Sequence, residues 1–123
     1  MLLDASFLID LERETLHRQH GPARRFLHTL RRRQVIVSVV TVEEILEGAA
    51  DEATALASLR GFAIQGLHLA HAGRCARLQR RSSARLGEND AWLVATAEVL
   101  GAEIVGADRP AFERLGDRYV RFR

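Results

Sequence analysis

Four acidic residues lie where a strand or a loop is expected to pass into a helix: Asp4, Glu44, Asp90 and Asp108. Right-handed crossovers in a parallel sheet bring the carboxyl ends of the strands and the starts of the following helices to one edge. Four carboxylates gathered at that edge would repel one another unless a cation neutralised them. Because divalent ions such as Mg²⁺ and Mn²⁺ prefer oxygen ligands, the set predicts a metal site.

Helix capping is the alternative role for each of these acids taken alone. Asp4, Asp90 and Asp108 each fit the N-terminal cap of a following helix, and the spacing from Thr41 to Glu44 is that of a capping box. Acids are common at helix starts because they complement the positive end of the helix dipole. The convergence of all four acids, rather than any one of them, favours metal binding.

The remaining composition excludes several other chemistries. All 18 basic residues are arginines, so P-loop and Schiff-base enzymes, which need a lysine, are excluded. The single cysteine, Cys75, can form neither an internal disulfide nor a zinc cage. The five histidines lack catalytic spacing, apart from the weak pair His68 and His71, and are expected on the surface or on helix faces.

The elements that must position the acids follow from hydrophobic spacing. Strands are expected at residues 2–3, 35–40, 67–69, 103–106 and 119–122. Helices are expected at residues 6–13, 22–33, 51–62, 70–86, 89–100 and 110–115, with a short helix opening at Thr41. This alternation predicts one α/β domain over residues 1–123, a three-layer α/β/α sandwich with a mostly parallel central sheet.

The N-terminus and the apolar runs bear on the cellular compartment. The first residues include the acids Asp4 and Asp10 and no basic segment, so they do not resemble a signal peptide. No apolar run approaches the roughly 20 residues that a membrane span needs. We therefore expect a cytoplasmic protein that does not contact a membrane.

Four blocks of sequence carry the acids. They read LDASFLI at residues 3–9, SVVTVEEILEG at 38–48, NDAWLVATA at 89–97 and IVGADRPAF at 104–112. In order and spacing, the blocks resemble the signatures of PIN-domain nucleases, and most closely those of the VapC toxins of prokaryotic toxin–antitoxin pairs. The resemblance spans essentially the whole chain, and it implies a PIN-like α/β/α fold.

The resemblance also implies an activity: an endoribonuclease that depends on Mg²⁺ or Mn²⁺, forms a homodimer and is blocked by a cognate antitoxin protein. It assigns catalysis and metal binding to Asp4, Glu44, Asp90 and Asp108. Ser6 matches the hydroxyl that lies two residues after the first aspartate. The choice of Glu44 over Glu43 or Glu47 rests on this resemblance. A water activated by the metal would leave 5′-phosphate and 3′-hydroxyl ends on the RNA.

Two positions depart from the family pattern. Gly106 stands where many members have a threonine, and Ala111 replaces an acid often found just before the phenylalanine. The first change removes a hydrogen-bonding side chain, and the second leaves Asp108 as the only carboxylate of its block. A PIN-type module that binds RNA or protein without cleavage is the competing interpretation, but the presence of all four acids favours catalysis. A DNA nuclease is disfavoured by the short chain.

Arginines are the candidates for contacts with RNA. Arg74, Arg77, Arg81 and Arg85 fall along one helical stripe that leads toward the helix start at Asp90, where they could bind phosphates. Because the net charge is only +2, local clusters of this kind must provide any nucleic-acid contact. A solvated helix face is the alternative.

Apolar residues near the N-terminus have two possible roles. The residues are Phe7, Leu8, Leu11, Phe26, Leu27 and Leu30. Such residues are usually core. The alternative is that some of them line a groove for an antitoxin helix or form a dimer interface.

Overall fold

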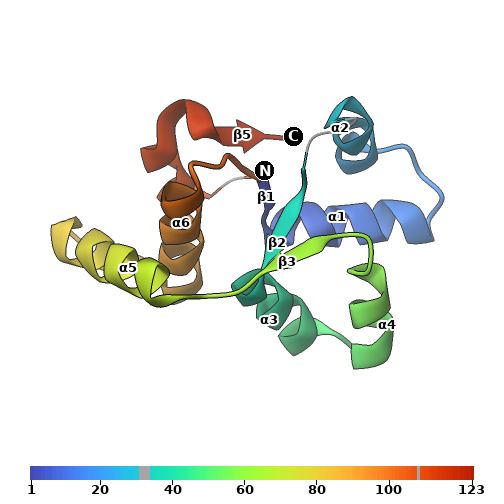
Figure 1. Ribbon diagram of the computed structural model, residues 1–123. Coiled ribbons are helices and arrows are strands. Elements are labelled where there is room, and N and C mark those ends of the chain that lie inside the picture. The colour runs from blue at the N-terminus through green and yellow to red at the C-terminus, as the bar shows by residue number, and fades with distance from the viewer. Residues whose placement is uncertain (31–33, 108) are drawn as a thin grey trace.

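The computed structural model describes residues 1–30, 34–107 and 109–123. Over these ranges the chain forms one sheet of five strands, all parallel, in the order β3-β2-β1-β4-β5 (Figure 1). The strands are β1 (Leu2–Leu3), β2 (Ile36–Ser38), β3 (Ala63–Gln65), β4 (Ile104–Gly106) and β5 (Tyr119–Arg121). The strand order reverses between β1 and β4, which is where open α/β sheets place their sites.

Helices cover both faces of this sheet. One layer contains α1 (Ala5–Leu16), α2 (Pro22–Leu30), α3 (Val39–Gly48) and α4 (Glu52–Ser58). The other contains α5 (Leu69–Arg81), α6 (Glu88–Leu100) and the 3-10 helix η1 (Pro110–Arg118). Figure 1 shows α5 and α6 on one side of the strands and α1, α2 and α4 on the other. The predicted three-layer α/β/α sandwich with a parallel sheet is confirmed.

Each strand divides its residues between the two layers, because successive side chains of a strand point to opposite faces. Leu2 and Ile104 join the buried cluster formed by α5, α6 and η1. Leu3 and Val105 join the cluster on the opposite face, with residues of α1, α2 and α3. All four side chains are fully buried. Strands this short are therefore anchored by apolar residues on both faces of the sheet.

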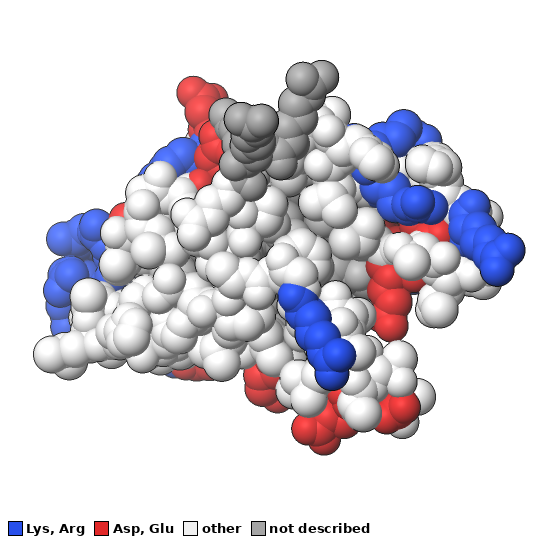
Figure 2. Space-filling view, turned by 45° about the vertical axis from the view of Figure 1, so that its right-hand side comes forward, with Lys and Arg blue, Asp and Glu red and all other residues white. Residues whose placement is uncertain are grey.

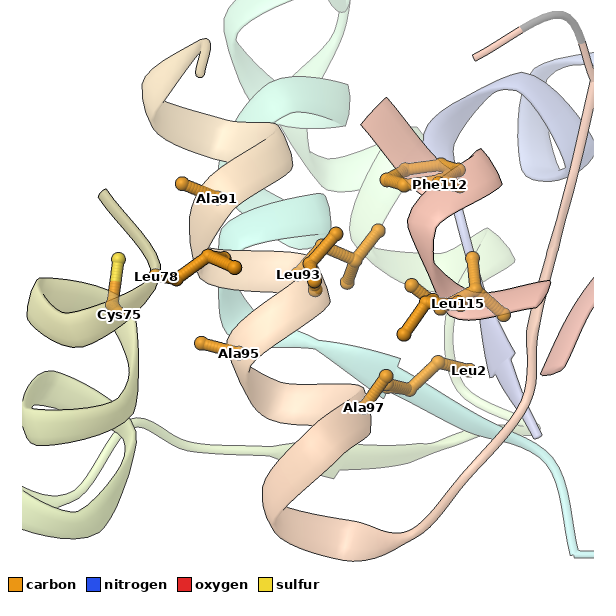
Figure 3. Packing of buried hydrophobic residues seen from close by; sticks show 11 residues of the cluster. Leu2, Cys75, Leu78, Ala91, Leu93, Ala95, Ala97, Phe112 and Leu115 are labelled. Atoms are coloured by element: carbon orange, nitrogen blue, oxygen red, sulfur yellow. The ribbon is translucent and has the colours of Figure 1, made fainter. Parts of the chain in front are cut away.

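Small residues allow α6 to lie close to its neighbours. Ala91, Ala95 and Ala97 are buried along this helix. Figure 3 shows α6 between α5, which contributes Cys75, and η1, which contributes Phe112. Because alanine side chains are short, the neighbouring helices approach the α6 backbone, and the first turn of α6 is held in a fixed place at the sheet edge.

The helix expected at residues 89–100 is confirmed to within one residue. It ends at Gly101, whose φ of 62° and ψ of 32° lie in the left-handed region. Glycine adopts this conformation without strain and often follows the last turn of a helix. The edge strand expected at the C-terminal end of the sequence is also confirmed as β5.

The expectation of a strand at residues 67–69 is wrong. The third strand is β3, at residues 63–65, and α5 begins at Leu69. Because β3 is an edge strand that pairs with β2, it has no need of apolar residues buried on both faces, and Ala63 and Ile64 are exposed. Leu67 and Leu69 have the composition of a strand, but their side chains are 37% and 89% exposed.

The second strand is shorter than the expected range of residues 35–40. Ser38 ends β2, and its Oγ accepts a hydrogen bond from the Val40 N–H at 3.1 Å, which makes Ser38 the N-cap of α3. Thr41 is therefore buried inside α3, and the capping box expected between Thr41 and Glu44 is wrong. A local serine cap outweighs the strand preference of the β-branched residues that follow.

Four other helix ends differ from expectation. One is the end of η1, which lies at Arg118 rather than near residue 115. α1 continues to Leu16, α4 ends at Ser58, and α5 ends at Arg81 rather than at residue 86. The Gln79 side chain in α5 accepts from the Leu86 N–H at 2.9 Å and donates to the Leu86 carbonyl at 3.1 Å. These hydrogen bonds hold a loop in place where the last helical turn was expected. The expected end of α2 at residue 33 lies outside the described residues. Within the described ranges, each helix is too short or too polar to cross a membrane.

Candidate active site

Asp4 lies directly after β1 and is almost completely buried, with 1% of its surface exposed. Its Oδ1 accepts hydrogen bonds from the Phe7 N–H at 2.9 Å and from the Ser6 hydroxyl at 2.7 Å. Asp4 is therefore the N-cap of α1, so the capping role expected for it is confirmed. Ser6 Oγ also accepts from the Ala107 N–H at 3.1 Å, which ties the Asp4 carboxylate to the end of β4.

The second carboxylate oxygen of Asp4 has a different environment. Oδ2 is buried and accepts no hydrogen bond from any residue that the structure describes. Burial raises the pKa of Asp4 above its usual value, and the nearby charge of Glu44 acts in the same direction, while Ser6, Phe7 and Arg109 oppose the shift. A buried acceptor without a donor is unfavourable, so this oxygen is suited to binding a cation.

Arg109 supplies the cation that the structure places near this oxygen. Its Nε lies 4.0 Å from Asp4 Oδ2, and its Nη1 donates to Asp90 Oδ1 at 3.4 Å. The guanidinium therefore lies between the two carboxylates. The N-cap of α6 is Gly87, and Asp90 lies within the first turn, so the capping role expected for Asp90 is wrong. Its carboxylate is turned toward Arg109 instead.

Glu44 approaches the same place from α3. Its Oε1 accepts a hydrogen bond from Asn89 Nδ2 at 3.0 Å, and its charge acts on Asp4. Glu43 and Glu47, the alternatives for this acid, are exposed. Asn89 is adjacent to Asp90 at the start of α6, so one helical turn contacts Glu44 and Arg109 together.

A shallow hollow of about 310 Å³ joins these groups. Its lining residues are Glu44, Gly87, Glu88, Asn89, Asp90 and Arg109. In the described part of the chain, no three acidic, histidine or cysteine side chains are grouped closely enough to hold a metal ion. Asp108, the fourth predicted acid, lies outside the described residues. The structure thus brings Asp4 and Asp90 together through Arg109, and brings Glu44 beside them through Asn89.

Arg109 and Asn89 are site residues to which the sequence analysis assigned no role. Both lie within blocks that carry a predicted acid, and Asn89 directly precedes Asp90. Position next to a predicted acid was therefore the available signal. A neighbouring residue joins the site only if its side chain points to the same edge, and that depends on the packing of α3, α6 and β4.

Gly106, at the end of β4, allows Asp4 to take its position. A Cβ atom at residue 106 would lie only 2.7 Å from Asp4 Cγ and would also contact Oδ2. The Asp4 carboxylate thus occupies the space that a larger side chain at this position would need. Glycine in place of the family's threonine at residue 106 therefore leaves room for the Asp4 carboxylate.

The four arginines of the predicted stripe do not stay together. Arg74, Arg77 and Arg81 line one cavity on the outer side of α5 and α6. Arg85 lies beyond the end of α5, pairs with Glu88 at 2.9 Å and lines a different hollow. Arg85 is separated because α5 ends at Arg81, so the helical spacing that defines the stripe stops there.

Comparison with known proteins gives both sequence and structural matches. The model of the PIN domain matches residues 1–117. A toxin–antitoxin complex from Klebsiella pneumoniae contains a chain that is 24% identical, with a TM-score of 0.74 over 97% of this chain and 98% of that one. No match was found among curated proteins.

Two further solved structures share the fold at lower identity. VapBC2 from Rickettsia felis, bound to a DNA fragment from their promoter, is 13% identical, with a TM-score of 0.74 over 98% of this chain and 95% of that one. VapBC-1 from nontypeable Haemophilus influenzae is 18% identical, with a TM-score of 0.71 over 98% and 94%. The family match covers nearly the whole sequence and agrees with the parallel sheet and its two helical layers. The chain belongs to the PIN domain family.

Proposed function

We propose that this protein is a metal-dependent endoribonuclease and the toxin of a VapC-like toxin–antitoxin pair. The observation that carries the proposal is the buried Oδ2 of Asp4, which lacks a hydrogen-bond donor among the described residues. Asp90 faces the same guanidinium as this oxygen, and Glu44 lies within electrostatic reach of it. Carboxylate oxygens are the ligands that a hard divalent ion prefers.

Mg²⁺ or Mn²⁺ would be held by the four predicted acids, Asp4, Glu44, Asp90 and Asp108. When bound, the ion would supply Lewis-acid activation of a water and of the scissile phosphate. The chain's own residues prepare the site for this chemistry. Ser6 and the Phe7 N–H donate to one oxygen of Asp4, and the other oxygen accepts from no residue that the structure describes. Asn89 fixes the orientation of the Glu44 carboxylate.

An antitoxin is the protein partner that we propose. The solved structures with this fold are described as toxin–antitoxin or VapBC complexes. An apolar hollow of about 370 Å³ is lined in part by Leu8, Leu11, Ile45 and Phe62. An adjoining hollow of about 410 Å³ shares Ile45 with it and also includes Glu44. An apolar antitoxin segment seated in this groove would end beside the acids and could block them.

A second copy of the chain is the other partner that we propose, through the outer edge of the sheet. Within the described residues, β3 pairs only with β2. The exposed side chains of Ile64, Leu67 and Leu69 follow this edge into the start of α5. Figure 2 shows one face of the molecule on which charged side chains are few and lie mainly along the margins. Exposed apolar side chains along an edge strand favour a homodimer contact.

RNA cleavage tests the proposed activity. The purified protein, free of antitoxin, is incubated with structured RNAs, including transfer RNAs, in the presence of Mg²⁺, Mn²⁺ or EDTA, beside the Asp4→Asn variant. We expect discrete cleavage that requires the metal, leaves 5′-phosphate and 3′-hydroxyl ends, and is absent in the variant. Equal cleavage by folded Asp4→Asn protein would contradict the role of Asp4, and 2′,3′-cyclic phosphate ends would contradict hydrolysis by a metal-activated water.

A binding module without catalysis is the second candidate function. The observation that favours it is Arg109, whose guanidinium already lies between the carboxylates of Asp4 and Asp90. This candidate predicts that the wild-type protein binds RNA but cleaves it no faster than the Asp4→Asn variant with any of the metals. The same assay therefore separates the two functions.

A further inference from the structure

A second polar cavity lies on the side of the molecule covered by α5, α6 and η1. It has a volume of about 430 Å³, and its lining residues are Arg74, Arg77, Leu78, Arg81, Glu98, Arg114 and Arg118. Arg114 and Arg118 come from η1, more than 30 residues after the α5 arginines, so sequence spacing alone does not reveal the cluster. The cavity shares no lining residue with the hollow at Glu44 and Asp90.

The cavity has a large excess of positive charge. Glu98 is the one acid among its lining residues, and it pairs with Arg74 at 3.4 Å. Arg114 donates to the neutral Ser82 hydroxyl at 3.0 Å. For Arg77, Arg81 and Arg118, no acid within salt-bridge distance is found in residues 1–30, 34–107 and 109–123. Among the described residues, four guanidiniums around this cavity thus have no carboxylate partner.

Some arginines elsewhere in the described ranges do have a carboxylate partner. Arg85 pairs with Glu88 at 2.9 Å, and Arg123 pairs with Asp10 at 2.8 Å. Uncompensated guanidiniums that share a cavity repel one another, so an anion between them would be strongly favoured. The planar guanidinium fork matches the oxygens of a phosphate group, which makes phosphate the anion that this lining fits best.

The position of the cavity relates it to the acids. Glu98 lies eight residues after Asp90 on α6, which corresponds to about 12 Å along the helix axis. A stacked nucleic-acid strand rises about 3.4 Å per nucleotide, so this distance corresponds to roughly three or four nucleotides. An RNA strand whose scissile phosphate lies at Asp4 and Asp90 could therefore place another phosphate in the cavity.

We propose that the arginine cavity is a phosphate site for the RNA backbone, remote from the cleavage position and built jointly by α5 and η1. The identification of RNA as the source of the phosphate rests on the proposed function. The site holds the strand through Arg77, Arg81, Arg114 and Arg118, while Arg85, although it belongs to the stripe seen in the sequence, takes no part.

The test measures RNA binding without cleavage. A fluorescently labelled single-stranded RNA is titrated with protein in EDTA at several salt concentrations, for the wild type, for the double variant Arg77→Gln/Arg118→Gln, and for Arg85→Gln as the matched control. Arg77 and Arg85 are exposed and Arg118 is half-buried, so circular dichroism is used to verify that each variant keeps the fold. We expect the double variant to bind RNA roughly tenfold more weakly. The salt slope, which is the slope of the logarithm of the affinity against the logarithm of the salt concentration, should fall in magnitude by about 0.7 for each lost phosphate contact. The control should match the wild type.

Two results of the RNA titration would overturn the proposal. One is an unchanged salt slope in the double variant, and the other is an equal loss in the Arg85→Gln control. A parallel titration with inorganic phosphate, followed by thermal unfolding, distinguishes a free anion from RNA. A phosphate-induced stabilisation that the double variant loses, combined with unchanged RNA binding, would assign the cavity to a free phosphate and contradict an RNA site. Because binding is measured in EDTA, a failure of the proposed nuclease activity does not affect the result.

Discussion

Asp4 combines two roles that make opposite demands on its carboxylate. As the N-cap of α1 it needs Oδ1 to accept hydrogen bonds, and both donors are in place at 2.9 and 2.7 Å. As a buried charge whose Oδ2 has no hydrogen-bond donor among the described residues, it is disfavoured by its surroundings, and its pKa is raised. The fold therefore tolerates a charge at this position that lowers its stability, as is common for side chains kept for binding or catalysis.

Removal of this charge is expected to stabilise the protein. A raised pKa means that the folded state binds the Asp4 proton more tightly than the unfolded state does. The stability gained from that proton is present below the unfolded pKa of about 3.8 and is lost as pH rises through the higher folded value. Asp4→Asn keeps the cap, so in EDTA its thermal midpoint at pH 7 should exceed that of the wild type by up to a few degrees.

A pH series supplies the control for this prediction. The advantage of Asp4→Asn should shrink as pH falls toward 3.8, where the wild-type carboxyl also becomes neutral. An advantage that is equal at all pH values, or a variant less stable than the wild type at pH 7, would contradict the account of Asp4. Mn²⁺ should raise the midpoint of the wild type and not that of the variant, because only a bound ion stabilises the folded state.

Arg109 is expected to compete with a metal ion. Its guanidinium lies near Asp4 and Asp90, so a divalent ion that binds these carboxylates must displace or repel it. Arg109→Gln should therefore bind Mn²⁺ several-fold more tightly in isothermal titration calorimetry. Arg60→Gln removes the same charge at an exposed position that does not line the hollow at these acids, and it should leave the affinity unchanged. Weaker binding by Arg109→Gln would instead make Arg109 a support of the metal site.

Some site residues could be predicted from the sequence and others could not. The junctions that carry Asp4, Glu44 and Asp90 follow from the alternation of strands and helices, since a parallel sheet sends all of them to one edge. The pairs of Arg109 with Asp90 and of Asn89 with Glu44 join residues 19 and 45 positions apart. Such pairs depend on how the elements cross, and no local pattern reports that.

At the scale of elements, the α1–α2 corner shows how one side chain fixes two helices. Glu14 of α1 is 7% exposed, and its two carboxylate oxygens accept from the Ala23 N–H at 2.9 Å and the Arg24 N–H at 2.8 Å. These N–H groups belong to the first turn of α2, where a helix supplies no carbonyl acceptor for them. A Cβ atom at Gly21 would collide with the Glu14 carboxylate, so the connection needs a glycine there.

Glu14→Gln should destabilise this corner. The variant keeps one acceptor oxygen and loses the charge, so at least one buried N–H is left without a good partner. We expect the free energy of unfolding to fall by about 1–3 kcal/mol in urea denaturation. Glu12→Gln, an exposed position on the same helix, is the control and should change the stability little. A comparable loss in both variants would contradict a special role for Glu14.

The errors of the sequence analysis at this scale have one cause. Residues 39 and 40 are valines that favour a strand, yet the Ser38 cap begins a helix there. Residues 67–69 have the composition of a buried strand, yet they lie outside the sheet and are largely exposed. The intrinsic preferences of amino acids for a strand differ by little in free energy. A single hydrogen bond or the position of an edge strand can therefore outweigh them.

The whole molecule has an exposed sheet edge that we assign to a second copy of the chain. Leu69→Asp should therefore convert a dimer into a monomer in light scattering coupled to gel filtration. Because Leu69 is 89% exposed, the stability of the monomer should not change. Leu16→Asp, at a position on α1 that is 74% exposed, is the control and should leave the dimer intact. A protein that is monomeric before any substitution would remove this assignment.

The architecture was the most predictable property at this scale. Alternating apolar segments specify strands buried on both faces, and with right-handed crossovers they leave few topologies open. The cavity formed by Arg77, Arg81, Arg114 and Arg118 illustrates the opposite case, because two separate segments contribute to it. A surface assembled from distant segments becomes visible only after the layers have been packed.

The single thiol of the chain, that of Cys75, can be used to measure how often one helical layer opens. Cys75 is 5% exposed between α5 and α6, and burial raises the pKa of its thiol. A thiol-specific reagent should therefore react slowly, and faster when α5 separates from α6. With no second cysteine, every labelled molecule reports the same residue. The labelling rate would then reflect how often α5 and α6 separate. Measured with and without RNA, it would show whether RNA bound in the adjacent arginine cavity changes that frequency.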